Sequence, residues 1–189
     1  SNPYNIVDAT KVPPELGIFD YTNEQNPIKD YNVVYIPYCT GDAHAGSNPD
    51  GEVAGNPTGG QFVGGDNYQL FLKRIVPTFP DVEKVLVTGY SAGSLGAAYH
   101  YWNVIQAFGQ DVSVVLIDDA GPPMRDPYFA ACLQQLCRTT WDMTEWLPDD
   151  CTDCNQEDGS GFHYLFGYVA EHYPNASLGL ISSLEDATM

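Results

Sequence analysis

Basic side chains are scarce in this sequence: seven Lys and Arg residues face 25 Asp and Glu residues, and the formal net charge is −18. Nucleic acids and anionic membranes are bound mainly through Lys and Arg, so neither is expected as a partner. Long apolar runs are also missing, and none approaches the ~20 residues that a bilayer-spanning helix needs. The acidic balance fits a secreted or salt-adapted protein, in which dissolved ions screen the repulsion, and it fits an ordinary solvated surface equally well.

The chain begins Ser1-Asn2-Pro3 without a signal peptide, as a processed or trimmed chain would. Its 189 residues are 43% hydrophobic and 13% aromatic, which excludes a disordered chain. This size is sufficient for one domain over residues 1–189 with its own hydrophobic core.

The stretch over residues 84–96 carries the pattern that is most informative about chemistry. An apolar run predicts a short buried strand, the pentapeptide G-Y-S-A-G follows at residues 89–93, and apolar residues at helical spacing come next. A strand, a tight turn and a helix in this order are typical of the nucleophile elbow. In this motif the strained turn exposes a serine hydroxyl, and glycines on both sides of the serine avoid collisions that a Cβ atom would cause. We therefore predict Ser91 as a nucleophile and the Ala92 N–H as an oxyanion donor. The alternative is a glycine-rich turn with an incidental serine.

Apolar patterns on both sides of this stretch predict an alternation of strands and helices. Such an alternation is typical of an α/β fold with a parallel, doubly wound sheet and right-handed crossovers. Residues 40–65 are rich in glycine and are expected to form a long irregular loop. The other expected strands are Val33–Tyr38, Val112–Ile117 and Ser177–Ser183, and the expected helices are Asp66–Phe79 with Asp66 as N-cap, a helix after the elbow that ends at Gly109, and Phe162–His172.

Five cysteines are present, and all except Cys39 lie in a segment that we interpret as an insertion over about 125–161: Cys132, Cys137, Cys151 and Cys154. Two disulfides are expected there, with a pairing that the sequence leaves open, which predicts an extracellular or periplasmic protein. A zinc site that includes Cys151 and Cys154 is the alternative. An acidic run in the same segment lacks the glycine and glutamate of a calcium loop and is expected to be solvated, so we predict neither a metal nor a cofactor.

Three further residues are expected near Ser91. Asp42 and His44 come directly after a predicted strand, at the sheet edge where open α/β folds bind ligands, and Tyr90 is adjacent to the serine. All three are candidates for the substrate-binding wall. For Asp42 and His44 the alternative is a solvated loop in which Asp42 caps a turn.

A serine nucleophile on such an elbow needs an acid after a later strand, and then a histidine. Asp186 fits the acid best, because it comes three residues after Ser183 at the end of an apolar strand. Asp118 and Asp119 are the alternatives, although hydrogen bonds to the turn at Gly121 would give them a structural role. All the histidines precede Asp186, so we expect the general base to lie outside this chain: they are His44, His100, His163 and His172.

Three segments resemble the pectin acetylesterase and Notum-type carboxylesterases, most closely the bacterial members. They are V-Y-I-P-Y-C-T-G-D-A-H-A-G at residues 34–46, G-Y-S-A-G-S at 89–94 and D-A-G-P at 119–122. The resemblance spans most of the chain and implies an α/β-hydrolase fold with a Ser-Asp-His triad that removes acyl groups, such as acetyl, from hydroxyls. It implies Ser91 as nucleophile, Ala92 as oxyanion donor and Asp186 as triad acid, with an acylated carbohydrate or small ester as substrate.

The family's Gly-Gly-Gly-x-Cys oxyanion strand and its triad histidine have no counterparts in this sequence. The resemblance therefore implies an incomplete middle segment of a longer, cleaved or truncated hydrolase. A companion segment of the same enzyme would supply the first strands, a cysteine for Cys39 and the histidine. The competing hypotheses are a catalytically inactive α/β-hydrolase-like binding protein and a polyester or lipid esterase on the same scaffold.

Overall fold

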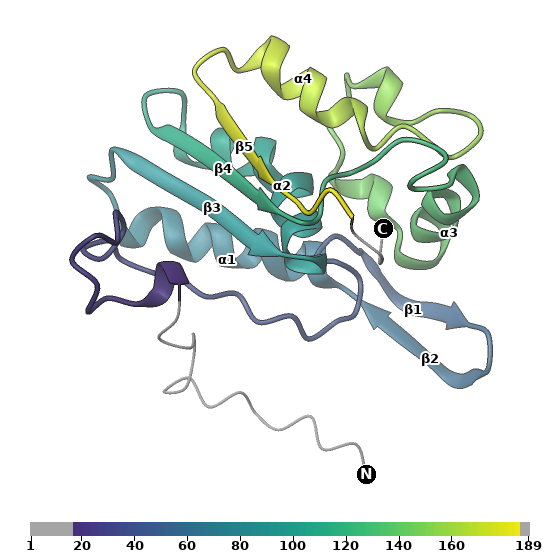
Figure 1. Ribbon diagram of the computed structural model, residues 1–189. Helices are drawn as coiled ribbons and strands as arrows, with labels where there is room; N and C mark the ends of the chain where they lie inside the picture. Colours follow the sequence, from purple (N-terminus) through teal and green to yellow (C-terminus); the bar gives the residue numbers. More distant parts are fainter. Residues whose placement is uncertain (1–16, 186–189) are drawn as a thin grey trace. The chain divides into compact units, whose positions relative to one another are not determined.

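The computed structural model describes residues 17–185 (Figure 1). The chain divides into two units between residues 37 and 38. In the first unit a 3₁₀ helix, η2 (Gly17–Phe19), is followed by turns. Asn26 organises these turns, because its Nδ2 donates to the carbonyl oxygens of Ile18 (2.8 Å) and Asp20 (3.0 Å). A single domain over residues 1–189 stays a prediction.

The strand predicted over Val33–Tyr38 is wrong, because these residues join no β-ladder in the described part of the chain. Val34 and Tyr35 are 49% and 52% exposed. β-Branched and aromatic residues favour an extended backbone, but a strand forms only where a neighbour pairs with its N–H and C=O groups.

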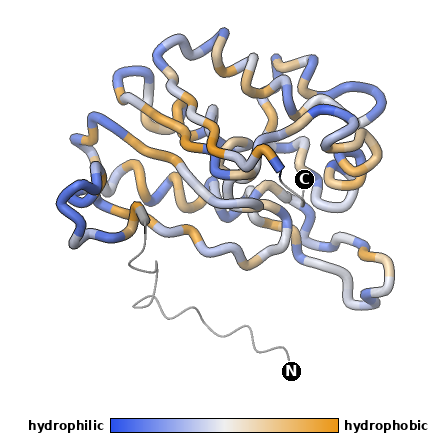
Figure 2. Tube along the Cα trace, viewed as in Figure 1, coloured by the Kyte–Doolittle hydropathy of each residue, from blue (hydrophilic) through white to orange (hydrophobic). Residues whose placement is uncertain are grey.

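Three parallel strands form the larger sheet described in the second unit, in the order β3–β4–β5. They are β3 (Lys84–Tyr90), β4 (Ser113–Asp119) and β5 (Ser177–Ile181), which confirms three of the predicted strands. Tyr90 lies opposite Asp119, and Asp119 lies opposite Ile181, so the carboxyl ends of all three strands meet at one edge. Figure 2 shows apolar residues along these strands and hydrophilic residues in the loops at their ends.

The helices confirm the predicted alternation with strands and hence the α/β class. In the described residues they are α1 (Gly64–Thr78), α2 (Ala92–Phe108), α3 (Ala131–Trp141) and α4 (Tyr164–His172), with short 3₁₀ helices η3 (Met143–Trp146) and η4 (Thr152–Cys154). Gly109 ends α2 with φ +87°, as predicted. No helix in this part of the chain is both long and apolar enough to cross a bilayer.

One face of the sheet is covered by α2, which packs against β3 and β4 (Figure 1). Burial along β4 alternates accordingly: Val114, Leu116 and Asp118 are buried, whereas Val115 and Ile117 are half-buried. Strands in sequential order with right-handed crossovers place their connecting helices on the same face. The described residues therefore form a singly covered sheet, and the second helical layer of a doubly wound fold is not among them.

Helix α1 begins before the predicted cap. Val63 is the N-cap residue, and Asp66 lies in the first turn, where its carboxylate accepts a hydrogen bond from Ser47 Oγ at 3.1 Å. Tyr68 and Leu72 form the buried face of this helix. Asp66 therefore anchors the preceding loop instead of capping the helix.

The irregular loop predicted over residues 40–65 contains an antiparallel hairpin of β1 (Asn48–Val53) and β2 (Asn56–Phe62). Two glycines of the hairpin leave room for the Phe62 ring. A Cβ would lie 2.4 Å from this side chain if added at Gly51, and 2.5 Å from it if added at Gly60. Without these glycines the ring could not pack across both strands. Two of the glycines in this stretch therefore permit close packing within a hairpin, which is irregular in register.

The cysteine-rich segment is attached to α2 by a buried apolar cluster. Tyr99 of α2 donates its hydroxyl to the Met143 carbonyl, and Trp102 Nε1 donates to the Trp146 carbonyl at 3.1 Å. The buried members of the cluster are Ala45, Tyr99, Met143, Leu147, Cys151, Cys154, Phe162 and Leu165.

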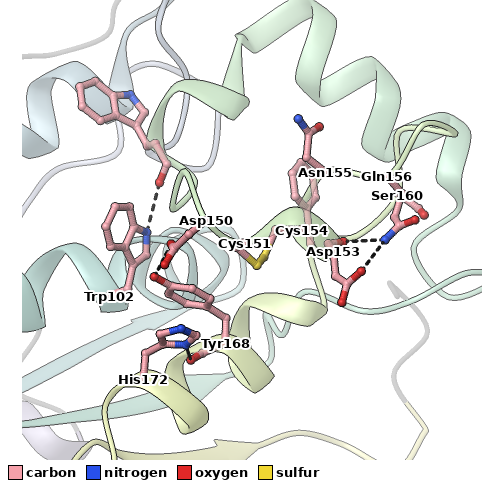
Figure 3. Close-up of a disulfide and its surroundings, with 12 residues drawn as sticks. Trp102, Asp150, Cys151, Asp153, Cys154, Asn155, Gln156, Ser160, Tyr168 and His172 are labelled. Atoms are coloured by element: carbon pink, nitrogen blue, oxygen red, sulfur yellow. Dashed lines mark hydrogen bonds between the residues drawn. A yellow bond between two sulfur atoms is a disulfide. The ribbon is translucent and has the colours of Figure 1, made fainter.

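Cys151 and Cys154 form a disulfide within this segment (Figure 3). Cys132 and Cys137 both lie in α3 and are free, and Cys39 is also free. Five residues along a helix correspond to a rotation of roughly 140°, so these two thiols point away from each other. The prediction of a second disulfide among these cysteines is wrong for this reason.

The alternative prediction for these cysteines was a zinc site. The sulfurs of Cys151 and Cys154 are bonded to each other and are therefore not available as zinc ligands. In the part of the chain that the structure describes, no group of three or more His, Cys, Asp or Glu side chains is placed to hold a metal ion.

Candidate active site

Ser91 lies between the end of β3 and the start of α2, with φ +55° and ψ −122°. A left-handed φ is costly for a residue with a Cβ and persists only where the surroundings impose it. The residue is exposed, whereas Ser94 one turn later is fully buried. Ser91 is therefore an exposed serine at a strained strand–turn–helix junction.

The glycine before the serine is required by close backbone packing. A Cβ at Gly89 would lie 2.3 Å from the Gly93 backbone, whereas a Cβ at Gly93 would meet nothing within 4 Å. The predicted collision is therefore confirmed for Gly89 and wrong for Gly93. A third glycine was missed: a Cβ at Gly121, after β4, would lie 2.4 Å from the Ser91 carbonyl oxygen.

Backbone hydrogen bonds hold Ser91 on both sides. Its N–H donates to the Asp119 carbonyl at 3.0 Å, and its carbonyl accepts from the N–H groups of Ser94 (2.9 Å) and Leu95 (3.0 Å). Ala92 is the first residue of α2, where amide groups have no acceptor within the helix. The start of this helix also adds a favourable dipole for negative charge.

An open groove lies at the carboxyl ends of the three parallel strands, beside the elbow. Its volume is ≈ 380 Å³. Tyr90, which is 73% exposed, lies on one side of it, and Asp119 lies at the end of the middle strand. The lining is Tyr90, Asp119, Ala120, Ile181, Ser182, Ser183 and Glu185. Asp186 lies outside the described residues, although its neighbour Glu185 belongs to this lining.

Asp42 lies in a tight turn whose backbone is strained. The Ala45 N–H donates to the Asp42 carbonyl at 3.0 Å, and the two residues between them, Ala43 and His44, have φ +52° and +59°. This turn packs on α2, where a Cβ at Gly96 would lie 2.4 Å from the Ala43 carbonyl oxygen. Gly96 therefore permits the contact between the turn and the elbow helix.

The Asp42 carboxylate is fully buried and holds this turn together. It accepts hydrogen bonds from Thr40 Oγ1 (2.5 Å), the His44 N–H (3.1 Å) and the Gly64 N–H (2.7 Å). Its contacts in this structure are those of a turn-capping residue, and neither Asp42 nor His44 lines the groove. Contact of these two residues with a substrate stays a prediction.

The four histidines of the chain contact groups other than Ser91 in the described residues. His44 lies beside Tyr38, with ring centroids 4.8 Å apart, and burial lowers the pKa of its imidazole. His100 is fully buried in α2. His163 and His172 stand at the two ends of α4, beside Tyr164 and Tyr168. None of the four hydrogen-bonds to Ser91 or lines the groove at the elbow.

Asp118 has the structural role that was its alternative assignment. Its Oδ1 accepts from the Gly121 N–H at 3.0 Å, as predicted, and also from Ser94 Oγ at 2.5 Å. The second bond was missed, because the sequence does not show that the first turn of α2 lies against the end of β4.

Comparison with known proteins identifies a family for this chain. A family model described as Pectinacetylesterase matches residues 8–188, which is nearly the whole chain. A search of curated proteins found no significant match. The family implies hydrolysis of acyl esters, and the structure has an exposed serine at a strained elbow beside an open groove. The chain belongs to the pectinacetylesterase family.

Proposed function

We propose that this chain carries the nucleophile of a serine carboxylesterase that removes acyl groups, such as acetyl, from hydroxyl groups of its substrate. The observation that carries this proposal is Ser91: it is exposed, and it has a left-handed backbone at a strand–helix junction. The family match supports ester hydrolysis, and the elbow supports the serine mechanism.

In the proposed reaction, Ser91 Oγ attacks the acyl carbon while a histidine accepts the hydroxyl proton. The Ala92 N–H donates to the developing oxyanion. The histidine then protonates the departing alcohol, which leaves an acyl-serine. Water attacks the acyl-serine as the histidine takes its proton, and the acid leaves as the proton returns to Ser91. Asp186 orients the imidazole and stabilises its positive charge.

The proposal places this histidine on a companion segment of the same enzyme, outside residues 1–189. The contacts of the four histidines described above support this placement. We expect Asp186 to lie at the same sheet edge as Ser91, about one imidazole width away, since the ring must bond to both groups at ~2.6–3.2 Å. The disulfide and the acidic composition support an extracellular or periplasmic location.

An organophosphonate should label Ser91 covalently in the complete protein, and Ser91→Ala should lower the rate of ester hydrolysis by at least ~10³-fold. Ser113→Ala is the matched control, because Ser113 is exposed at the opposite end of the same sheet. Peptide mapping by mass spectrometry identifies the labelled serine. Labelling at another serine, or none, would refute the elbow assignment.

The second candidate is an inactive hydrolase-like binding protein, which the positions of the four histidines also favour. Residues 1–189 expressed alone should hydrolyse p-nitrophenyl acetate no faster than their Ser91→Ala version under either hypothesis. The complete protein separates the two, since only the esterase hypothesis predicts a rate that depends on Ser91. A panel of acetylated carbohydrates, lipid esters and polyesters then identifies the substrate.

A further inference from the structure

Asp118 is a fully buried carboxylate that the proposed reaction does not use. It is 0% exposed at the end of β4, on the face that α2 covers. Its Oδ1 accepts both hydrogen bonds, from Ser94 Oγ at 2.5 Å and from the Gly121 N–H at 3.0 Å. Its Oδ2 is buried and has no hydrogen-bond partner among the described residues. A carboxylate in such surroundings is costly, so its presence calls for a specific role.

Asp118 binds Ser94 and Gly121, and both of these residues contact the backbone of Ser91. Ser94 donates its N–H to the Ser91 carbonyl at 2.9 Å. Gly121 lies so close that a Cβ there would be 2.4 Å from the same carbonyl oxygen and 2.7 Å from the Ser94 Cβ. Asp119, the residue after Asp118, also holds the Ser91 backbone, because its carbonyl accepts a hydrogen bond from the Ser91 N–H at 3.0 Å.

We propose that Asp118 is a positioning residue for the nucleophile: one carboxylate oxygen ties the first turn of α2 to the turn after β4 and thereby holds Ser91 in its left-handed conformation. The catalytic consequence rests on the proposed esterase function, whereas the structural consequence does not. A backbone with φ +55° would otherwise relax toward the α or β region. Relaxation would move the Ser91 hydroxyl from its present position.

The geometry specifies which property of Asp118 matters. Only Oδ1 makes hydrogen bonds, and an amide oxygen accepts two hydrogen bonds as well as a carboxylate oxygen does. Burial also raises the pKa of this carboxyl, against the opposing effect of its hydrogen bonds to Ser94 and Gly121. The negative charge of Asp118 is therefore not needed to hold the turn at Ser91, whereas a hydrogen-bond acceptor at the Oδ1 position is needed.

The test compares four variants of the complete protein: Asp118→Asn, Asp118→Ala, Ser94→Ala and Thr88→Val. Thr88→Val is the matched control, because Thr88 Oγ1 donates a hydrogen bond from β3 to β4 (to the Ile117 carbonyl, 2.9 Å) and not to the residues that hold Ser91. For each variant, kcat and KM are measured on p-nitrophenyl acetate, and a crystal structure gives φ of Ser91. If Asp118→Ala fails to fold, Ser94→Ala still tests the proposal, because it removes the hydrogen bond between Ser94 and Asp118 from the other side.

We expect kcat to fall about 10²-fold in Ser94→Ala and Asp118→Ala, with KM within about threefold, because a displaced nucleophile weakens the chemical step more than substrate binding. Ser91 should leave the left-handed region in both. Asp118→Asn should retain the wild-type φ and a kcat within about threefold, as should Thr88→Val.

Three results would overturn the proposal. They are wild-type kcat in both truncated variants, an unchanged φ of Ser91 in both truncated variants, and an Asp118→Asn enzyme as damaged as Asp118→Ala. Absence of hydrolysis by the wild-type protein would instead refute the esterase function, and φ of Ser91 in the variants would still decide the positioning role.

Discussion

The His100 imidazole is fully buried within α2, and its contacts identify its protonation state. Nε2 lies 2.8 Å from the His44 carbonyl and must donate to it, while Nδ1 lies 3.3 Å from Asn103 Nδ2 and must accept. The ring also stacks on Tyr68, with centroids 4.3 Å apart. Only the neutral ring satisfies both nitrogens, and burial lowers the pKa of His100 to about 4.

We predict that the free energy of unfolding falls as the pH is lowered from about 6.5 toward 4. In that range the unfolded chain binds a proton at this histidine and the folded chain does not, so acid favours unfolding. The full effect is roughly 3 kcal/mol. Because carboxyl groups also titrate there, the measurement is the difference in pH dependence between wild type and His100→Gln, by denaturant unfolding. His172→Gln, at an exposed position, is the control, and equal slopes in wild type and His100→Gln would refute the assignment.

Among the secondary-structure elements, α3 contributes the buried side chain of Arg138, which binds the loop that follows the disulfide. Arg138 is buried, its guanidinium lies 4.1 Å from the centroid of the Phe162 ring, and no carboxylate pairs with it among the described residues. Instead it donates four hydrogen bonds to the loop that follows the disulfide, accepted by the carbonyls of Cys154, Gly159 and Ser160 and the side chain of Asn155.

Arg138→Met should lower the free energy of unfolding by about 3 kcal/mol, because it leaves several buried carbonyl groups without a donor. Arg138→Lys should restore only part of this loss, since an ammonium group lacks the planar fork of donors. Thermal and denaturant unfolding measure both effects. Arg74→Met on the exposed side of α1 is the control, with an expected change within about 0.5 kcal/mol. A loss no larger than that of the control would contradict this role.

For the molecule as a whole, the net charge of −18 is the dominant electrostatic property. The ion pair found among the described residues joins Lys29 and Glu24, so most of the acidic side chains are balanced only by dissolved ions. We predict that raising NaCl from about 0.01 to 0.15 M increases the melting temperature by a few degrees, because screening weakens the repulsion within the folded chain.

The exposed acidic residues after α3 offer a matched comparison. The variant Asp149→Asn/Glu157→Gln removes two negative charges at exposed positions and should show a smaller increase with salt. Sucrose, which does not screen charge, should raise the melting temperature of both proteins equally. A salt response that is the same in both proteins would show that repulsion does not limit stability.

The sequence alone determines the parts of this protein whose information is local. The three parallel strands, the tight turn between β3 and α2, and the end of α2 at Gly109 are each encoded by adjacent residues: an apolar run, a small-residue turn or a left-handed glycine. The structural role of Asp118 was also accessible, because its partner Gly121 is only three residues away.

Only the tertiary structure decides features that depend on contacts between distant segments. Val33–Tyr38 has strand composition but pairs with no neighbour within residues 17–185, whereas the glycine-rich chain over 48–62 pairs with itself because its glycines accommodate the Phe62 ring. Ser94 is an ordinary helical serine until β4 brings Asp118 to within 2.5 Å of its hydroxyl. The contact between Ser94 and Asp118 joins residues 24 positions apart, and the packing of α2 on the sheet, not any periodic pattern, selects it.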